Sequence, residues 1–356
     1  MPSTAAVAAP ILRIALGHAD LPNESKGGVA HQTHHLANAL VRRGHHVTVV
    51  TFSPRAPDAL YEVRTLAKPR VPRFAMPFAF AIALREQDFR AFDVVHFMGD
   101  NYLARTGGVP SVRTFNGSAR DEMRSAQSLR RKIGQGVLIP LEAWGARRAN
   151  FVTGISETTR LRFPQVAEVI PCGVDLSAFA PGVKEEKPTL LFVGTKDGRK
   201  RGQWLADLWV RAILPRLPVG SVLWAVADEP LEGAGIENFG RVSFDRLTDL
   251  YRRAWAFCLP STYEGFGVPY IEAFASGTVA VGSPNPGAQE VLGGGKYGVV
   301  AGDDALAGEL VSLLTDTERR RSYEALGTAR AAEYGWSGVV SRYEAIYHRL
   351  IAERCR

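Results

Sequence analysis

The sequence of 356 residues has few cysteines: Cys172, Cys258 and Cys355, which lie far apart and are odd in number. Such a set provides neither the paired framework of a disulfide-rich secreted domain nor the Cys-x-x-Cys spacing of a zinc site. We therefore expect a cytoplasmic protein. No apolar run approaches the roughly 20 residues that a transmembrane helix needs, and Arg13 interrupts the apolar N-terminal stretch, which has no basic region before it as a signal peptide would. Any contact with a membrane is expected to be peripheral.

Several sequence motifs for cofactors are also missing. There is no Asp-x-Asp pair for a metal-bound phosphate, and the glycines near the N-terminus do not follow the Gly-x-Gly-x-x-Gly spacing of a dinucleotide site. His31, His34 and His35 share one face of a predicted helix, but no carboxylate or cysteine stands near them in the sequence. We expect no metal and no cofactor.

The composition is that of a globular protein with room for two domains. Hydrophobic residues make up 46% of the chain and charged residues 22%, and a length of 356 residues exceeds that of one ordinary core. The formal net charge of +7 favours anionic partners such as nucleotide phosphates or anionic lipid headgroups. No basic stripe interleaved with aromatic residues occurs, so nucleic acid is not expected.

The N-terminal part has the alternating pattern of an α/β fold. It predicts strands over 11–16 and 46–51 and, between them, a helix over 29–43 that begins after the Gly27-Gly28 pair. This is a βαβ unit. Further strands are expected at 61–66, 92–97, 111–115, 151–157 and 169–175.

The apolar stretch from Phe74 to Leu84 is predicted to be a helix that packs on the sheet. A membrane-docking patch is the alternative, because Arg70, Arg73 and Arg85 flank its aromatic residues.

The most informative stretch runs from Pro260 to Gly277, with the sequence PSTYEGFGVPYIEAFASG. A buried strand over 254–259 precedes it, Pro269 begins a short helix, and Gly277 ends that helix. A glycine loop at a helix start lets a ligand approach the backbone and favours an anion. Glu264, at the loop entrance, and Glu272, in the first helical turn, are expected to face one cleft outside the apolar core. They suit a ligand with phosphate and hydroxyl groups; metal chelation and solvated helix-end carboxylates are the alternatives.

The pattern Glu-Gly-Phe-Gly-x-Pro-x-x-Glu-Ala closely resembles the Glu-x7-Glu signature of the family 4 (group 1) retaining glycosyltransferases. The segment from Val169 to Asp175, VIPCGVD, is similar to the family's segment before the interdomain hinge. The resemblance implies a GT-B fold, in which two Rossmann-like domains face each other across a cleft and the last helix returns to the N-terminal domain. It also implies transfer of a sugar from a nucleotide-diphosphate donor to a hydroxyl acceptor: a glycan, a lipid-linked molecule or a small molecule.

The domains implied are an acceptor-side domain of residues 1–180, a linker of residues 181–188, a donor-binding domain of residues 189–336 and a returning helix of residues 337–356. The strand over 189–194 is followed by a basic loop with Arg199 and Lys200, a turn typical of phosphate binding, and then by a long helix. Further strands are expected at 221–227 and 278–282, and a helix at 247–253.

The resemblance assigns roles to matching residues of this sequence. Glu264 would act on the transferred sugar, near Asn116 on the acceptor side, as the two catalytic positions. The residues implied in donor binding are Gly27, Gly28, Arg199, Lys200, Phe266, Gly267, Glu272 and Glu290.

Two positions depart from the family pattern. Thr195 stands where members commonly have Arg, and Asn116 stands where many have His. Because of these departures, a protein that binds sugar nucleotides but has little catalytic activity remains an alternative. A sugar-phosphate phosphorylase or an epimerase on the same architecture is the other alternative.

Overall fold

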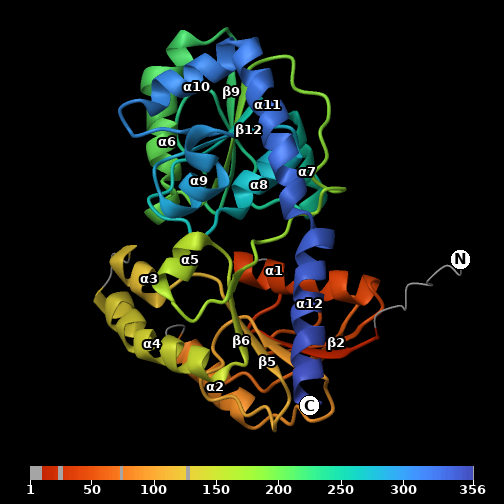
Figure 1. Ribbon diagram of the computed structural model, residues 1–356. Helices are drawn as coiled ribbons and strands as arrows, with labels where there is room; N and C mark the ends of the chain where they lie inside the picture. Colours follow the sequence, from red (N-terminus) through yellow and green to blue (C-terminus); the bar gives the residue numbers. More distant parts are fainter. Residues whose placement is uncertain (1–9, 23–26, 73–74, 126–128, 356) are drawn as a thin grey trace, which may run out of the picture.

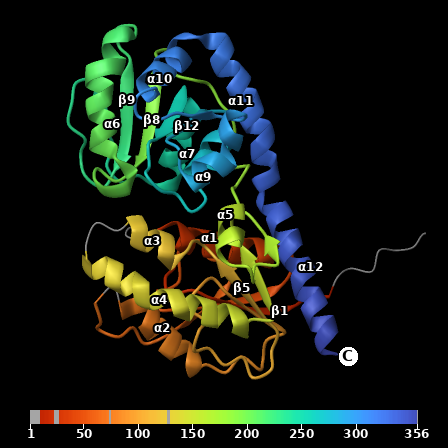
Figure 2. The same ribbon diagram turned by 60° about the vertical axis from the view of Figure 1, so that its left-hand side comes forward.

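The computed structural model describes residues 10–22, 27–72, 75–125 and 129–355. The chain forms two α/β domains that face each other, with a long helical segment along one side (Figures 1 and 2). Each domain contains a sheet in which all the paired strands run parallel. This is the GT-B arrangement that the sequence predicts.

The N-terminal sheet has seven strands in the order β3-β2-β1-β4-β5-β6-β7. Its strands are β1 Arg13–Gly17, β2 His46–Thr51, β3 Glu62–Thr65, β4 Val94–Phe97, β5 Ser111–Phe115, β6 Phe151–Gly154 and β7 Glu168–Val169. Its helices are α1 Gly28–Arg42, α2 Met76–Arg85, α3 Ala119–Ser125, α4 Leu129–Arg148 and α5 Glu157–Arg162. The central strands β4 and β5 are buried along their whole length, because helices cover both faces of a parallel sheet.

Helix α2 belongs to the core of this domain. Phe80 and Leu84 are fully buried against Phe52, Val95 and Phe97, below one face of the sheet. The expected packing helix is therefore confirmed for most of the stretch, while Phe74 and Arg73 lie outside the described residues.

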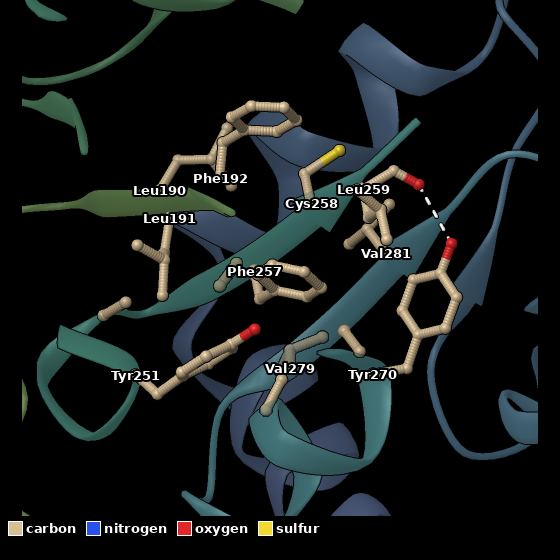
Figure 3. Packing of buried hydrophobic residues seen from close by; sticks show 14 of the residues in the cluster. Leu190, Leu191, Phe192, Tyr251, Phe257, Cys258, Leu259, Tyr270, Val279 and Val281 are labelled. Atoms are coloured by element: carbon tan, nitrogen blue, oxygen red, sulfur yellow. Dashed lines mark hydrogen bonds between the residues drawn. The ribbon is translucent and has the colours of Figure 1, made fainter. Parts of the chain in front are cut away.

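The C-terminal sheet has six strands in the order β10-β9-β8-β11-β12-β13. Its strands are β8 Thr189–Gly194, β9 Val222–Ala227, β10 Ile236–Asn238, β11 Ala256–Leu259, β12 Val279–Gly282 and β13 Val299–Val300. The helices after β8 are α6 Gly202–Leu208, α7 Phe244–Arg253, α8 Val268–Ala275, α9 Pro286–Val291, α10 Leu306–Thr315, α11 Thr317–Ala331 and α12 Trp336–Arg354. Figure 3 shows how side chains of β8, β11 and β12 interlock with Tyr251 of α7 and Tyr270 of α8 in the core of this domain.

Helix α12 begins beside the C-terminal domain and then packs on the N-terminal one. Its buried residues recur every three or four positions and join the N-terminal core: Val339, Val340, Tyr343, Ile346, Tyr347 and Leu350. The Tyr347 hydroxyl lies 2.7 Å from Nδ1 of the fully buried His96. The returning last helix is thus confirmed (Figure 2).

The chain crosses between the domains at two adjacent points. Val174 on the outward path forms a β-bridge with Gly335 on the return path. The segment expected as a linker is bound to the C-terminal domain, since the ammonium of Lys184 donates to the Thr278 hydroxyl at 2.6 Å and Glu185 pairs with Arg253. The outward and return connections between the domains thus meet at this bridge.

Some element boundaries differ from the sequence expectation. Of the strand expected over 169–175, only Val169 is in the sheet, as the end of β7, because Pro171 has no N–H to donate to a ladder. The strand expected over 254–259 begins at Ala256, since Ala254 still caps α7. The long helix expected after residue 202 ends at Leu208 and continues as a wider π turn. No helix in the described part of the chain is both long enough and apolar enough to cross a bilayer.

Candidate functional site

A cleft of about 520 Å³ lies between the two domains, where the carboxyl ends of the parallel strands meet. Both domains contribute to its walls. From the sequence-predicted set it brings together Gly27, Gly28, Asn116, Arg199, Lys200, Glu264, Phe266, Gly267 and Glu272.

One position in the glycine loop of the C-terminal domain has a backbone conformation that only glycine can adopt without strain. Gly267 precedes α8 with φ of +99°, and a Cβ there would lie 2.5 Å from the ring of Tyr270. The Tyr270 hydroxyl donates to the Leu259 carbonyl at 3.0 Å, which ties the first turn of α8 to the end of β11 (Figure 3). The loop therefore holds the N-terminus of α8, which no side chain caps, against the cleft.

Arg199 and Lys200 converge on Glu264 from a 3₁₀ turn, Gly198–Lys200. The Lys200 ammonium donates to Oε1 of Glu264 at 2.6 Å, and Nη1 of Arg199 lies 3.1 Å from the same oxygen. Nη1 of Arg199 also donates to the Tyr263 carbonyl at 2.7 Å. The two cations are thus fixed by the loop that they flank.

Glu264 lines the cleft among charged partners, as expected, but it is nearly buried, with 5% of its surface exposed. Burial alone would raise the pKa of its carboxyl group, but the charges of Lys200 and Arg199 outweigh burial and hold that pKa below the usual value. Burial lowers the pKa of Lys200 in turn. Glu264 is therefore an ionised carboxylate in an ion pair that a ligand phosphate would have to share.

Glu272 has a different environment. It is the fifth residue of α8, one residue beyond the expected first turn, because the helix begins at Val268. Burial raises the pKa of its carboxyl group to about 7. The two carboxylates of the motif face one cleft, as expected, but they differ in charge state near neutral pH.

Gly27 and Gly28 form the opposite wall, at the N-terminus of α1. A Cβ at either position would meet no atom within 4 Å, so both face open space. Gly27 is extended, with φ of −87°, and no side chain caps the helix. The pair therefore leaves room beside free helix N–H groups, rather than providing an unusual backbone conformation.

Asn116 lines the cleft from the N-terminal domain, opposite the glycine loop. Its side-chain amide donates to the Met98 carbonyl at 3.0 Å. Its own backbone oxygen would lie 3.4 Å from a Cβ on Gly265, an ordinary van der Waals contact between the two walls of the cleft.

Two charged residues, Glu142 and Arg113, lie behind the N-terminal wall of the cleft. The Glu142 carboxylate accepts hydrogen bonds from the Ala119 backbone N–H at 3.2 and 3.1 Å, and burial raises its pKa to about 7. Arg113, which is 2% exposed, bonds the side chain of Asn101.

Two residues singled out from the sequence lie elsewhere. Glu290 belongs to α9 and does not line this cleft. Its carboxylate reaches the start of α5, where its two oxygens accept hydrogen bonds from the Glu157 N–H at 3.0 and 3.1 Å. Thr195 donates its hydroxyl to the Asp197 carbonyl at 2.7 Å and is not among the residues that line the cleft.

The histidines of α1 do have a carboxylate neighbour, contrary to the sequence argument. Nε2 of His34 lies 3.1 Å from Asp58, and its Nδ1 lies 2.8 Å from the Tyr61 hydroxyl. Asp58 is 24 residues away, so only the fold reveals the contact. In the described residues, no group of three or more His, Cys, Asp or Glu side chains is arranged to hold a metal ion.

One end of the cleft is aromatic, which no sequence motif indicated. Here His35 of α1 lies 6.0 Å from Trp336 and 6.3 Å from Phe244, measured between ring centroids. Phe179 and Leu247 complete this end. These residues come from four separate segments, so no motif spacing could have grouped them. Burial lowers the pKa of His35 to about 4, which keeps the ring neutral.

The comparisons with known proteins agree with this geometry. The model described as Glycosyltransferase Family 4 matches residues 26–178, and that of Glycosyl transferases group 1 matches residues 227–330. The phosphatidyl-myo-inositol mannosyltransferase of Mycobacterium tuberculosis (strain ATCC 25618 / H37Rv) is 28% identical over 91% of this chain and 93% of its own length. The D-inositol 3-phosphate glycosyltransferase of Nocardiopsis dassonvillei is 27% identical over 86% of this chain and 81% of its own length.

Solved structures show the same fold. Sucrose-phosphate synthase from Thermosynechococcus elongatus superposes with a TM-score of 0.80 at 21% identity, covering 96% of this chain and 99% of that one. Anabaena HepE in complex with UDP-glucose superposes with a TM-score of 0.69 at 15% identity, covering 96% and 98%. Together with the cleft and its Glu-x7-Glu loop, these matches show that the chain belongs to the family 4 (group 1) glycosyltransferases of GT-B fold.

Proposed function

We propose that this glycosyltransferase moves a hexose from a nucleotide-diphosphate sugar to a hydroxyl acceptor, with retention of configuration and without a metal ion. The observation that carries the proposal is the meeting, in one cleft, of a cation pair, two carboxylates and two uncapped helix N-termini. Cations and free N–H groups bind phosphate, and carboxylates bind hydroxyl groups.

The donor is assigned along the C-terminal wall. Arg199 and Lys200 take the diphosphate, Glu272 takes the ribose hydroxyls, and the backbone N–H groups of Phe266 and Gly267 hold the sugar and its phosphate. The HepE structure is a complex with UDP-glucose, which supports a nucleotide sugar as the donor on this fold.

The acceptor is assigned to the N-terminal wall beside Asn116, and Gly27 and Gly28 are assigned to the part of that wall that approaches both the donor phosphate and the acceptor. The relatives are named for phosphatidyl-myo-inositol and for inositol 3-phosphate, which are both hydroxyl-bearing acceptors. These names support a polyol or glycan acceptor, free or linked to lipid.

In the proposed reaction, the bond between the sugar and the diphosphate breaks while the acceptor oxygen bonds to the same sugar carbon on the same face. The acceptor proton passes to the departing phosphate oxygen, whose growing charge Arg199 and Lys200 stabilise. The ionised Glu264 lies beside the sugar position, where positive charge grows during bond breaking. Closure of the domains would exclude water and align the reactants.

A two-stage experiment tests the proposal. First, a thermal-shift panel of nucleotide sugars identifies the donor, because a ligand that binds the folded state raises the melting temperature. Transfer from that donor to inositol-type acceptors is then followed by mass spectrometry with excess chelator present, and the product configuration is read by NMR.

We expect chelator-resistant transfer with retention. A strict need for a divalent ion, or an inverted product, would refute that part of the proposal. Donor binding without turnover would indicate a binding protein instead, and turnover that depends on phosphate would indicate a phosphorylase.

A further inference from the structure

The outer face of helix α4, Leu129–Arg148, is apolar rather than polar. Four large hydrophobic side chains on it are half exposed or more: Leu129 at 72%, Ile133 at 62%, Val137 at 50% and Trp144 at 50%. With the exposed Pro140 they are spaced four, four, three and four residues apart, so they form one stripe along the helix. At a rise of 1.5 Å per residue the stripe is about 22 Å long.

Basic residues stand at both ends of this stripe. Arg130 and Lys132 are exposed at the beginning of α4, and Arg147 and Arg148 are exposed at its end. The guanidinium of Arg148 lies 5.9 Å from the ring centroid of Trp144.

The outer face of α4 carries no acidic side chain of this helix to balance its basic residues. Glu142 is the acidic residue in the α4 sequence, and its carboxylate turns inward to the Ala119 N–H. In both views of the molecule α4 lies on the outside of the N-terminal domain, next to α3 (Figures 1 and 2).

We propose that this face of α4 is a docking surface for an anionic lipid bilayer. An apolar stripe with basic residues around it is the composition of a helix that lies in the membrane interface, with the stripe among the acyl chains and the cations at the headgroups. Trp144 suits this boundary, because indole has an apolar body and an N–H donor.

A second copy of the chain fits this face less well. A twofold axis perpendicular to α4 would place Arg130 and Lys132 opposite Arg147 and Arg148 of the other copy, and a twofold axis along α4 would place each basic end opposite the same end of the other copy. Each end would then bring like charges together, with no acidic partner from α4. An anionic surface neutralises all of these cations at once.

The membrane surface is also connected to the cleft. Helix α4 holds α3 through the hydrogen bond between Glu142 and Ala119, and Ala119 is two residues after the cleft residue Gly117. A bilayer on α4 would therefore lie one helix layer from the acceptor wall. This surface differs from the patch considered at Phe74–Leu84, where Phe80 and Leu84 are in the core.

Co-sedimentation with vesicles tests the surface. The full chain is mixed with vesicles of phosphatidylcholine alone and of phosphatidylcholine with phosphatidylglycerol. We expect binding to the second kind, and a loss on adding salt. Ile133→Ser should weaken the partition coefficient by about tenfold, because a buried aliphatic side chain is lost. The double variant Arg130→Gln with Lys132→Gln should weaken it by more than about tenfold.

A matched control comes from the other domain. Val219 is 97% exposed in the loop before β9, so Val219→Ser removes similar apolar area far from α4 and should bind as the wild type does. None of these positions lines the cleft, so transfer to a water-soluble acceptor should stay unchanged in every variant.

Several results would overturn the proposal. Failure of the wild type to bind anionic vesicles would do so, as would equal binding by Ile133→Ser and the wild type. A dimer seen by light scattering that Ile133→Ser dissociates would assign the face to a second copy instead. Because vesicle binding is measured without a donor, these outcomes are independent of the proposed transfer reaction.

Discussion

Removal of the charge of Glu264 should destabilise the free protein and change its response to nucleotide. In the structure Glu264 is 5% exposed and pairs with Lys200 at 2.6 Å. Breaking one side of a buried ion pair costs about 3–5 kcal/mol. In Glu264→Gln the amide oxygen still accepts from Lys200, so the loss should fall to about 2 kcal/mol, within the range of a charged hydrogen bond. The melting temperature should drop by about 4–8 °C.

The stability that Glu264→Gln loses relative to the wild type should depend on pH in a defined direction. The pKa of Glu264 is held below its ordinary value of 4.5, so its contribution is fully present above that value and is lost as pH falls through the folded-state pKa. The deficit of Glu264→Gln should therefore be complete at neutral pH and shrink in acid.

A nucleoside diphosphate should reverse part of this deficit. With the carboxylate gone, the ligand phosphate becomes the counter-charge for Lys200, so saturating UDP or GDP should raise the melting temperature of the variant more than that of the wild type. The turnover number should still fall, because Glu264 lies beside the predicted reacting sugar. A suitable control is Asp303→Asn, which breaks the ion pair with Arg201 at 2.7 Å, where Asp303 is 56% exposed. It should change stability by less than about 1 kcal/mol. Equal melting of Glu264→Gln and the control, with equal nucleotide shifts, would refute this reasoning.

Three further predictions follow from the geometry of the cleft. Glu272 should bind ribose as a carboxylate, although burial raises the pKa of its side chain from 4.5 to about 7. The nucleotide affinity measured by calorimetry should therefore rise by up to about tenfold per pH unit below pH 7 and level off above it. Glu272→Gln should raise the donor KM and remove this pH dependence. Gly267→Ala should abolish nucleotide binding and lower the melting temperature, because φ of +99° and the Tyr270 ring at 2.5 Å leave no place for a Cβ; wild-type affinity in this variant would contradict the loop geometry. Donor binding should compact the molecule in small-angle scattering by rotation about the Val174–Gly335 bridge, and an unchanged profile at saturation would count against closure.

Much of the architecture follows from the sequence. Buried parallel strands such as Ser111–Phe115 and Thr189–Gly194 have the expected bounds, because a short apolar run with polar or glycine ends has few other placements in an α/β protein. The loop between Glu264 and Gly267 is predictable too, since the glycines and Pro269 are adjacent in the chain.

Long-range contacts were not predictable. The burial of Glu264 depends on Lys200, which is 64 residues away, and the contact between His34 and Asp58 depends on how the segment after β2 folds back. Helical periodicity cannot tell which face of a helix points outward, so the sequence did not reveal that the apolar stripe of α4 is exposed.

The cleft is proposed to bind a nucleotide through separate subsites for phosphate and ribose. The most direct test is calorimetric titration of the wild type, Lys200→Met and Glu272→Gln with a nucleoside diphosphate and with the matching nucleoside. In the wild type the diphosphate should bind far more tightly than the nucleoside. Lys200→Met should reduce that difference by lowering diphosphate affinity, whereas Glu272→Gln should weaken both ligands alike. Equal affinity of the wild type for both ligands, or no effect of Lys200→Met, would show that the cleft has no separate phosphate subsite at Lys200.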